Sequence, residues 1–137
     1  VDIMNDNVLA CRERLFAIWD EEYTAHCKGD ASDEVREAVR FIIGRNIING
    51  NALTLMCVDE EGKDTSAPIV FSEWTLISGT QMQRSDYTMS DLLTYNDNSV
   101  EDGMGNLFAL TEDEKEEGGI FLRRYITHYK KVQDYGD

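Results

Sequence analysis

The sequence has little of what most recognisable sites are built from: among 137 residues there are one proline, two histidines and three cysteines. Two imidazoles are too few for a metal centre or a catalytic site made of several histidines. Apolar runs such as residues 41–43 and 68–71 are far shorter than the roughly 20 residues that a membrane-spanning helix needs. No basic segment followed by an apolar core opens the chain, so we expect no secretory leader and a cytoplasmic location.

The three cysteines form an odd set, Cys11, Cys27 and Cys57. Cys11 and Cys27 fall on one predicted helix, about 24 Å apart at 1.5 Å per residue. That separation is too large for a disulfide. We therefore expect reduced, partly buried thiols in a reducing compartment.

What the chain does contain is typical of a folded domain. Hydrophobic residues make up 42% of it and aromatic residues 9%, which is too much for an intrinsically disordered chain. A chain of this length buries enough surface to fold as one domain without a disulfide or a metal. We interpret residues 1–3 as a cloning remnant ahead of Met4, and we predict a single globular domain over residues 4–137.

Two helices are predicted in the N-terminal third of the chain. The first covers residues 5–27, and the second begins after Ser32, a good N-cap residue, and runs to about residue 46. The short connection between them predicts an antiparallel helical hairpin. The apolar residues at helical spacing that are expected to face the core are Val8, Cys11, Leu15 and Ile18, widened by Leu9, Phe16, Trp19 and Tyr23, in the first helix, and Val35, Val39, Ile42 and Ile43 in the second.

A small antiparallel sheet is predicted to follow the helices. Residues 52–58 and 69–78 have the composition of strands, and we expect them to pair as a hairpin with a long acidic tip. The pattern weakens over residues 79–105, where Ser90 caps a short helix or the chain is irregular. Residues 106–110 are a candidate for a further strand.

The C-terminal part of the chain predicts a last helix. Thr111 and Glu114 fit a capping box. The fold class that we predict is α+β, with two N-terminal helices, a small antiparallel sheet of two to four strands, and a C-terminal helix packed on it. The residues expected to line the apolar face of that last helix are Leu122, Tyr125, Ile126, Tyr129 and Val132.

The charge of the chain is strongly negative, with a net value of −14 from 27 acidic residues against 13 lysines and arginines. Most of the excess lies between residues 46 and 122, where the only bases are Lys63, Arg84 and Lys115. Such a field repels nucleic acids and anionic membranes and attracts basic protein surfaces. We therefore expect a basic protein as the partner, with no direct nucleic-acid binding and no membrane binding.

No motif for catalysis or for a cofactor is found in the sequence. Glu22 and His26 are four residues apart on a predicted helix, but two ligands do not make a metal site, so we expect an exposed ion pair. Cys27 follows His26 directly, and neighbouring side chains on a helix point about 100° apart, which is poor geometry for a nucleophile and its base. We predict a protein that is not an enzyme and that has no metal and no cofactor.

The clustered acids are the best candidates for a functional surface. Duplex DNA carries about one charge per 1.7 Å of its axis, and a row of carboxylates can imitate that line of charge. The predicted partner-binding residues are Asp59, Glu60, Glu61 and Asp64 at the hairpin tip, Glu101 and Asp102 in a loop, and Glu112, Asp113, Glu114, Glu116 and Glu117 at a helix start.

The working hypothesis is an acidic, non-enzymatic binding protein that inhibits or modulates a basic, nucleic-acid-handling protein. A small, acidic chain without motifs is similar in general character to inhibitors encoded by phages and mobile elements, some of which mimic nucleic acid. No residue motif carries that similarity, and no family is assigned. Two alternatives stay open: an immunity protein or antitoxin that neutralises a basic toxin, and a structural or assembly component of a virion or complex.

Overall fold

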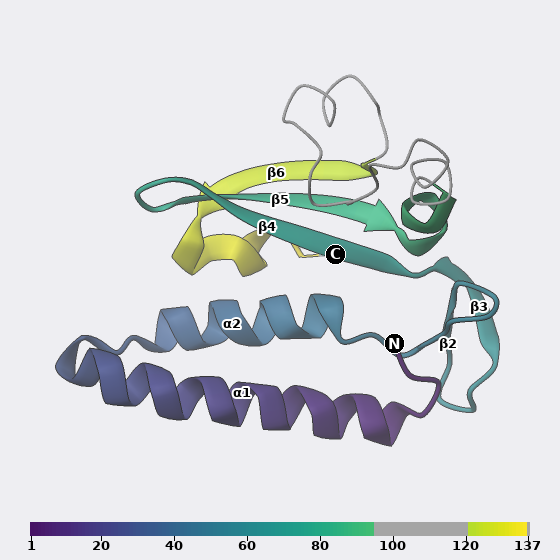
Figure 1. Cartoon of the computed structure of the whole chain (residues 1–137), viewed down its shortest axis with the longest axis horizontal. Helices are drawn as coiled ribbons and strands as arrows, with labels where there is room; N and C mark the ends of the chain where they lie inside the picture. The colour runs from purple at the N-terminus through teal and green to yellow at the C-terminus, as the bar shows by residue number, and fades with distance from the viewer. Residues whose placement is uncertain (95–120, 137) are drawn as a thin grey trace, which may run out of the picture.

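The computed structural model describes residues 1–94 and 121–136 and arranges them as a helical hairpin beside two small antiparallel sheets (Figure 1). Helix α1 (Asn5–Cys27) leads through a short 3-10 turn, η1 (Lys28–Asp30), into helix α2 (Asp33–Asn46). The two helices pack side by side in opposite directions. The predicted helices and their hairpin are confirmed.

The first sheet lies beside the N-terminal end of α1 (Figure 1). It consists of β1 (Gly50–Asn51), β2 (Met56–Val58) and β3 (Asp64–Pro68), in that order and antiparallel. All of β3 is exposed. The turn between β2 and β3 carries the acidic tip that the sequence predicts.

The second sheet covers one side of α2 (Figure 1). Its strands are β4 (Val70–Ser78), β5 (Gln81–Thr88) and β6 (Arg123–His128), antiparallel in the order β4-β5-β6. A 3-10 segment, η3 (Tyr129–Tyr135), follows β6 and packs on α2. Helix α2 therefore lies between α1 and this sheet and joins the two layers.

The apolar core is small and draws on both layers. Ile69, between β3 and β4, has none of its surface exposed, and its Cδ1 atom lies only 2.7 Å from the place where a Cβ on Gly50 would be. Gly50 is therefore required by this close approach. The buried apolar residues are Val8, Phe16, Ala38, Val58, Ile69, Tyr87 and Val132.

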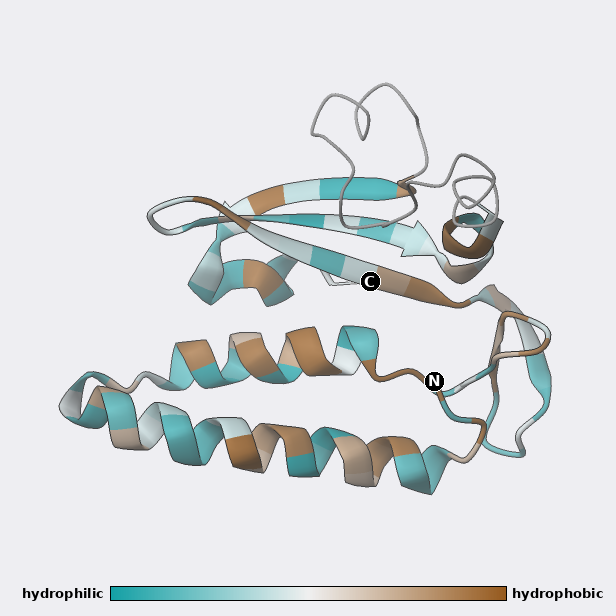
Figure 2. Cartoon of the chain, viewed as in Figure 1, coloured by the Kyte–Doolittle hydropathy of each residue, from teal (hydrophilic) through white to brown (hydrophobic). Residues whose placement is uncertain are grey.

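The face of α1 that was predicted to be buried is wrong in part. Cys11 is exposed, and Leu15 and Ile18 keep 42% and 65% of their surface accessible. Val8 and Phe16, which were also predicted to face the core, are buried as expected. Two apolar stripes share this helix (Figure 2 shows hydrophobic residues at several places along it), and only one of them can face α2.

Arg12 explains which stripe of α1 faces α2. Its Nε and Nη2 atoms donate to the carbonyl of Ile47 at 2.9 and 2.6 Å, and Nη2 also donates to the carbonyl of Gly44 at 3.1 Å. The carbonyls at a helix C-terminus have no partner within the helix and attract a cation. Arg12 thus fixes the orientation of α1, and the side of the helix that carries Leu15 and Ile18 is turned outward.

The predicted pairing of strands is wrong. Residues 52–55 form a turn, and β2 pairs with β3 while β4 pairs with β5. The missed strand, β5, buries Arg84, Ser85 and Asp86 at its centre. Because strands normally bury apolar or β-branched side chains, this polar triplet reads as a loop.

The prediction of a last helix is wrong over its first half. Residues 123–128 form strand β6, and only the short η3 follows. Leu122 and Ile126, expected on a buried helical face, are 53% and 54% exposed. Over such a short apolar run the periods of a helix and a strand cannot be distinguished. The predicted strand at 106–110 and the capping box of Thr111 and Glu114 lie outside the described residues.

The structure also shows the short helix after β5, the contacts of the N-terminal residues and the state of the cysteines. Residues 89–94 are helical, and Thr88 rather than Ser90 caps them, its Oγ1 accepting from the N–H of Asp91 at 3.1 Å. The N–H of Asp2, a residue left out of the predicted domain, donates to the carbonyl of Ile48, and the carbonyl of Asp2 accepts from the N–H of Gly50.

The three thiols are free. In the described part of the chain no helix is long and apolar enough to cross a membrane.

Candidate functional site

The acidic tip between β2 and β3 is held by its own carboxylates. Asp59 accepts from the backbone N–H groups of Glu61 and Lys63 at 2.9 and 3.0 Å, and Gly62 takes a positive φ of 79° to close the turn. Asp64 accepts from the side-chain amide of Asn51 at 3.1 Å. Asp59 and Asp64 thus shape the turn.

The remaining two acids of the tip point their charge to solvent. Glu60 is exposed, and Glu61 forms an ion pair with Lys63 at 3.0 Å in which both side chains are exposed. An exposed pair of this kind contributes at most about 1 kcal/mol. The four predicted residues of the tip are therefore brought together at one exposed turn, with Lys63 among them and Asp64 as the first residue of β3.

The other predicted partner-binding residues lie outside the described part of the chain. The structure thus neither places them beside the tip nor separates them from it. They are Glu101, Asp102, Glu112, Asp113, Glu114, Glu116 and Glu117.

Several acids on the helical hairpin form ion pairs within the protein. Arg36 contacts Asp20 at 2.7 Å and Asp33 at 2.9 Å, bridging α1 and α2. The expected exposed ion pair between Glu22 and His26 is confirmed at 3.2 Å. The acids of the hairpin are spread along two helices, whereas the tip gathers four acids within residues 59–64.

The largest polar feature of the interior was not predicted: a buried cluster around Asp86. Arg84 binds this carboxylate through two hydrogen bonds of 2.8 Å, and Ser72 donates to it at 2.6 Å. Arg45 and Arg123 reach the same carboxylate at 3.4 and 3.3 Å. These five residues, the Asp86 cluster, join α2, β4, β5 and β6 through one shared buried carboxylate.

Arg84 is enclosed by aromatic rings as well as by its carboxylate partner. Its guanidinium carbon lies 5.6, 5.7 and 5.1 Å from the ring centres of Phe41, Trp74 and Tyr125. Its Nη1 donates to the carbonyl of Gly136 at 2.6 Å. Arginine can contact aromatic faces and form a bidentate pair of hydrogen bonds with a carboxylate at the same time. Lysine cannot supply this geometry.

The cluster keeps Asp86 ionised. Burial alone raises the pKa of this carboxyl, but the hydrogen bonds from Arg84 and Ser72 and the charges of Arg84 and Arg45 outweigh it, so the pKa is lowered from its usual 3.8. A carboxylate that has no exposed surface and is occupied by these donors cannot accept a proton from a ligand. Its contacts connect α2, β4, β5 and β6.

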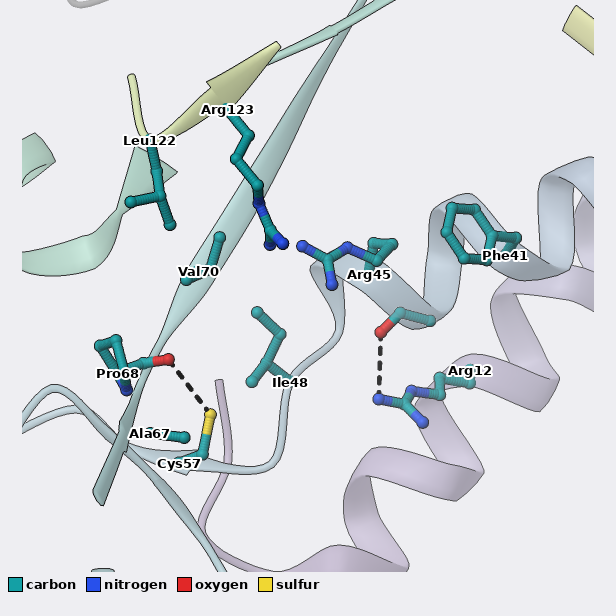
Figure 3. A pocket seen from close by; sticks show the side chains of 11 residues that line it. Arg12, Phe41, Arg45, Ile48, Cys57, Ala67, Pro68, Val70, Leu122 and Arg123 are labelled. Carbon is teal, nitrogen blue, oxygen red and sulfur yellow. Dashed lines mark hydrogen bonds between the residues drawn. The ribbon is translucent and has the colours of Figure 1, made fainter. Parts of the chain in front are cut away.

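A pocket of about 890 Å³ opens next to the Asp86 cluster, at the C-terminal end of α2 (Figure 3). Figure 3 shows the guanidinium groups of Arg45 and Arg123 facing each other on its wall, with Ile48 and Val70 below them. Both arginines hold Asp86, and Arg12, at the edge of the pocket, holds carbonyls of α2. The cations that line the pocket thus have partners within the protein.

The described lining of the pocket is mostly apolar and basic. Among its lining residues, all in the described part of the chain, there is no aspartate, glutamate or histidine to act as a general acid or base. Its one nucleophilic group is Cys57, whose Sγ donates to the carbonyl of Pro68 at 3.5 Å. Burial raises the pKa of this thiol, against the opposing charge of Arg45, and a protonated thiol is a weak nucleophile.

The sequence contains a signal for the Asp86 cluster. Arg84 stands alone in an acidic stretch, and Asp86 follows two residues later. On a strand, residues i and i+2 point to the same face, so the two charges can meet. A lone base two positions from an acid, within a run ending in Tyr87 and Thr88, is consistent with a strand that buries an ion pair.

Tyr87 provides a test of this sheet at high pH. Its hydroxyl donates to Glu73 at 2.9 Å, and burial, followed by Glu73, raises its pKa from 10 to about 12. Because the folded state favours the protonated phenol, this stabilisation is complete below pH 10 and is lost as the pH rises through about 12. We expect Tyr87→Phe to reduce the fall in unfolding free energy between these values, measured by urea titration, whereas Tyr135→Phe, at an exposed tyrosine, should leave the fall in place.

In the described part of the chain no three histidine, cysteine, aspartate or glutamate side chains gather into a group that could hold a metal ion. Charge and exposed surface are therefore the features of this molecule that bear on its function. Comparison with known proteins does not add to them, since no protein-family model, no curated protein and no solved structure matches the chain.

Proposed function

We propose that this protein is a non-enzymatic binding protein whose acidic surface engages a basic, nucleic-acid-handling protein and inhibits or modulates it. The observation that supports the proposal is how the fold distributes its charges. Within the described residues the arginines are mostly turned inward, while the acids of the tip stand on the surface. The arginines that are buried or half-buried are Arg12, Arg36, Arg45, Arg84, Arg123 and Arg124.

The guanidinium groups of these arginines are bound by partners within the protein. Arg84 is enclosed with Asp86, and Arg12 is bound to backbone carbonyls. Glu60 and Glu61, by contrast, are exposed at a turn that projects from the first sheet. A fold that hides bases and displays acids presents a more negative surface than its composition alone implies, and such a surface steers a cationic partner toward it.

The salt dependence of binding tests this proposal. We would immobilise the protein, apply an extract of its source cells at about 0.05 M salt, and elute with rising salt. The expected result is retention of basic, nucleic-acid-binding proteins that elute by about 0.3 M salt and that duplex DNA displaces in competition. Retention of neutral proteins only, or retention that salt does not weaken, would refute it. A single small basic toxin among the eluted proteins would instead favour an antitoxin.

A charge-reversal pair locates the binding surface. We expect Glu60→Lys with Glu61→Lys to weaken binding of the captured partner about tenfold or more, because both residues stand at the tip. The matched control is Glu34→Lys with Glu37→Lys, which makes the same change in net charge at exposed positions on α2. Affinity would be measured by calorimetry or surface plasmon resonance, and melting temperatures would show that both variants fold. An equal loss of affinity in the two variants would mean that the tip is not the site.

A further inference from the structure

The outward side of α1 carries an apolar strip that the fold does not use. Its members are Cys11, Leu15 and Ile18, with Met4 at the start of the helix, and all four are exposed. Ile18 is 65% accessible and Met4 54%. At 3.6 residues per turn this outer strip lies roughly 110° around the helix from the side that packs on α2. Figure 1 shows that α2 lies between α1 and the second sheet, so α1 is the outer of the two helices.

The spacing of the outer strip is that of a helix–helix seam. From Cys11 to Leu15 is four residues and from Leu15 to Ile18 is three, the alternation that brings apolar side chains into contact with a second helix. Helix α1 has 23 residues, about 34 Å at 1.5 Å per residue. It is long enough to support a seam of two or three heptads.

Charges beside the strip identify what fits on it. Arg14 and Glu21 are both exposed, and they occupy the same position in successive heptads, on the edge of the strip away from α2. If a second α1 runs antiparallel with its Ile18 against Leu15, its Glu21 lies beside Arg14, and the two-fold axis repeats this pair. A parallel arrangement would not bring these two side chains together, because each would then face the opposite edge of the partner's strip. The strip is thus self-complementary in one orientation, as an isologous interface must be.

We propose that the outer strip of α1 is a homodimer interface in which two copies pack antiparallel about a two-fold axis. Leu15 and Ile18 of each copy form the central layers, and the two Arg14–Glu21 pairs flank them. Cys11 falls opposite Glu22 of the second copy, whose long side chain can extend past the seam to water. A helix of this length buries a modest area, and a dimer of micromolar affinity is expected.

Sedimentation velocity over about 1 to 300 µM protein tests the dimer. Wild type is expected to shift from monomer to dimer, and Ile18→Lys should raise the dissociation constant about a hundredfold, because the side chain is buried twice in a symmetric interface. Ala17→Lys is the matched control, since Ala17 is exposed but points about 100° away from Ile18, and its effect should be within about twofold. A monomer at every concentration, or a dimer that tolerates Ile18→Lys with normal helical circular dichroism, would overturn the proposal.

The orientation of the dimer is tested by exchanging charges. Arg14→Glu alone and Glu21→Arg alone should each weaken the dimer, because each creates two contacts between like charges, and the double variant should restore it. Oxidation gives a second test in the Cys27→Ser, Cys57→Ser background. The antiparallel seam separates the two Cys11 residues by about 16 Å, so no Cys11 disulfide should form. Failure of the double variant to restore the dimer, or rapid cross-linking through Cys11, would overturn the antiparallel arrangement.

Discussion

Asp86→Asn is expected to lower the free energy of unfolding by about 3–5 kcal/mol at pH 7, the usual cost of removing one partner from a buried ion pair. The carboxylate has no exposed surface and is the shared acceptor for Arg84, Arg45 and Arg123. The amide of asparagine cannot neutralise the buried Arg84. Its NH2 group would also replace one carboxylate oxygen and place a hydrogen-bond donor against the donors of the arginines. Urea titration followed by tryptophan fluorescence would measure the change.

The pH dependence of the same variant separates loss of charge from loss of shape. Because the pKa of Asp86 is lowered in the folded state, its contribution is present above the unfolded pKa of about 4 and is lost as the pH falls through the folded value. The stability gap between wild type and Asp86→Asn should therefore narrow in acid. Asp91→Asn, at an exposed position, should change stability by less than about 0.5 kcal/mol. A gap that is small at pH 7, or constant with pH, would contradict the electrostatic account.

Ile69→Ala is expected to cost about 2–5 kcal/mol, the range for deleting a large aliphatic side chain from a core. Ile69 is fully buried where the chain passes from the first sheet to the second, and its backbone bonds to both Leu55 and Met89. Gly50, directly beneath its side chain, has no side chain that could move into the space. Ile126→Ala, at a strand residue that is 54% exposed, is the control and should cost less than about 1 kcal/mol.

Gly50 supplies the second half of a double-mutant cycle. Gly50→Ala in the wild type brings a Cβ to within 2.7 Å of the Ile69 Cδ1 atom and should cost about 1–3 kcal/mol through overpacking. In the Ile69→Ala protein that clash is absent, and the added methyl group occupies part of the cavity. The two costs should therefore not add. Additive losses in denaturant titrations would show that the two residues do not share this space.

The helical hairpin could be predicted from the sequence because its determinants are local. The apolar spacing of residues 5–27 and the acids after Ser32 define the two helices without reference to the rest of the chain. The side on which α1 packs could not be predicted in this way. Two stripes of similar apolar character compete, and the choice between them depends on Arg12 reaching the carbonyls of Gly44 and Ile47, more than thirty residues away along the chain.

The second sheet was harder to predict because its centre is polar. Burial of either Arg84 or Asp86 alone would be unfavourable, and burial of both as an ion pair is acceptable. A pattern that treats each residue separately cannot detect this dependence. Nor does the sequence indicate that Arg45, on a helix, and Arg123, on the last strand, converge on the same carboxylate. Of the predicted site, the structure places the four acids of the tip together at one exposed turn and the first residue of β3. Their grouping could be predicted because it depends only on a short connection.

The layer order of the fold implies a hierarchy of local unfolding. Helix α1 makes its extensive contacts with α2, whereas α2 also packs on β4 and η3. Separation of the first helix would expose one interface and leave the Asp86 cluster, which contains no residue of α1, assembled. Partial opening at the amino-terminal edge should thus require less free energy than global denaturation, as expected for a peripheral foldon. Association of two molecules through that helix would oppose such fraying, so self-assembly and resistance to proteolysis would rise together with concentration.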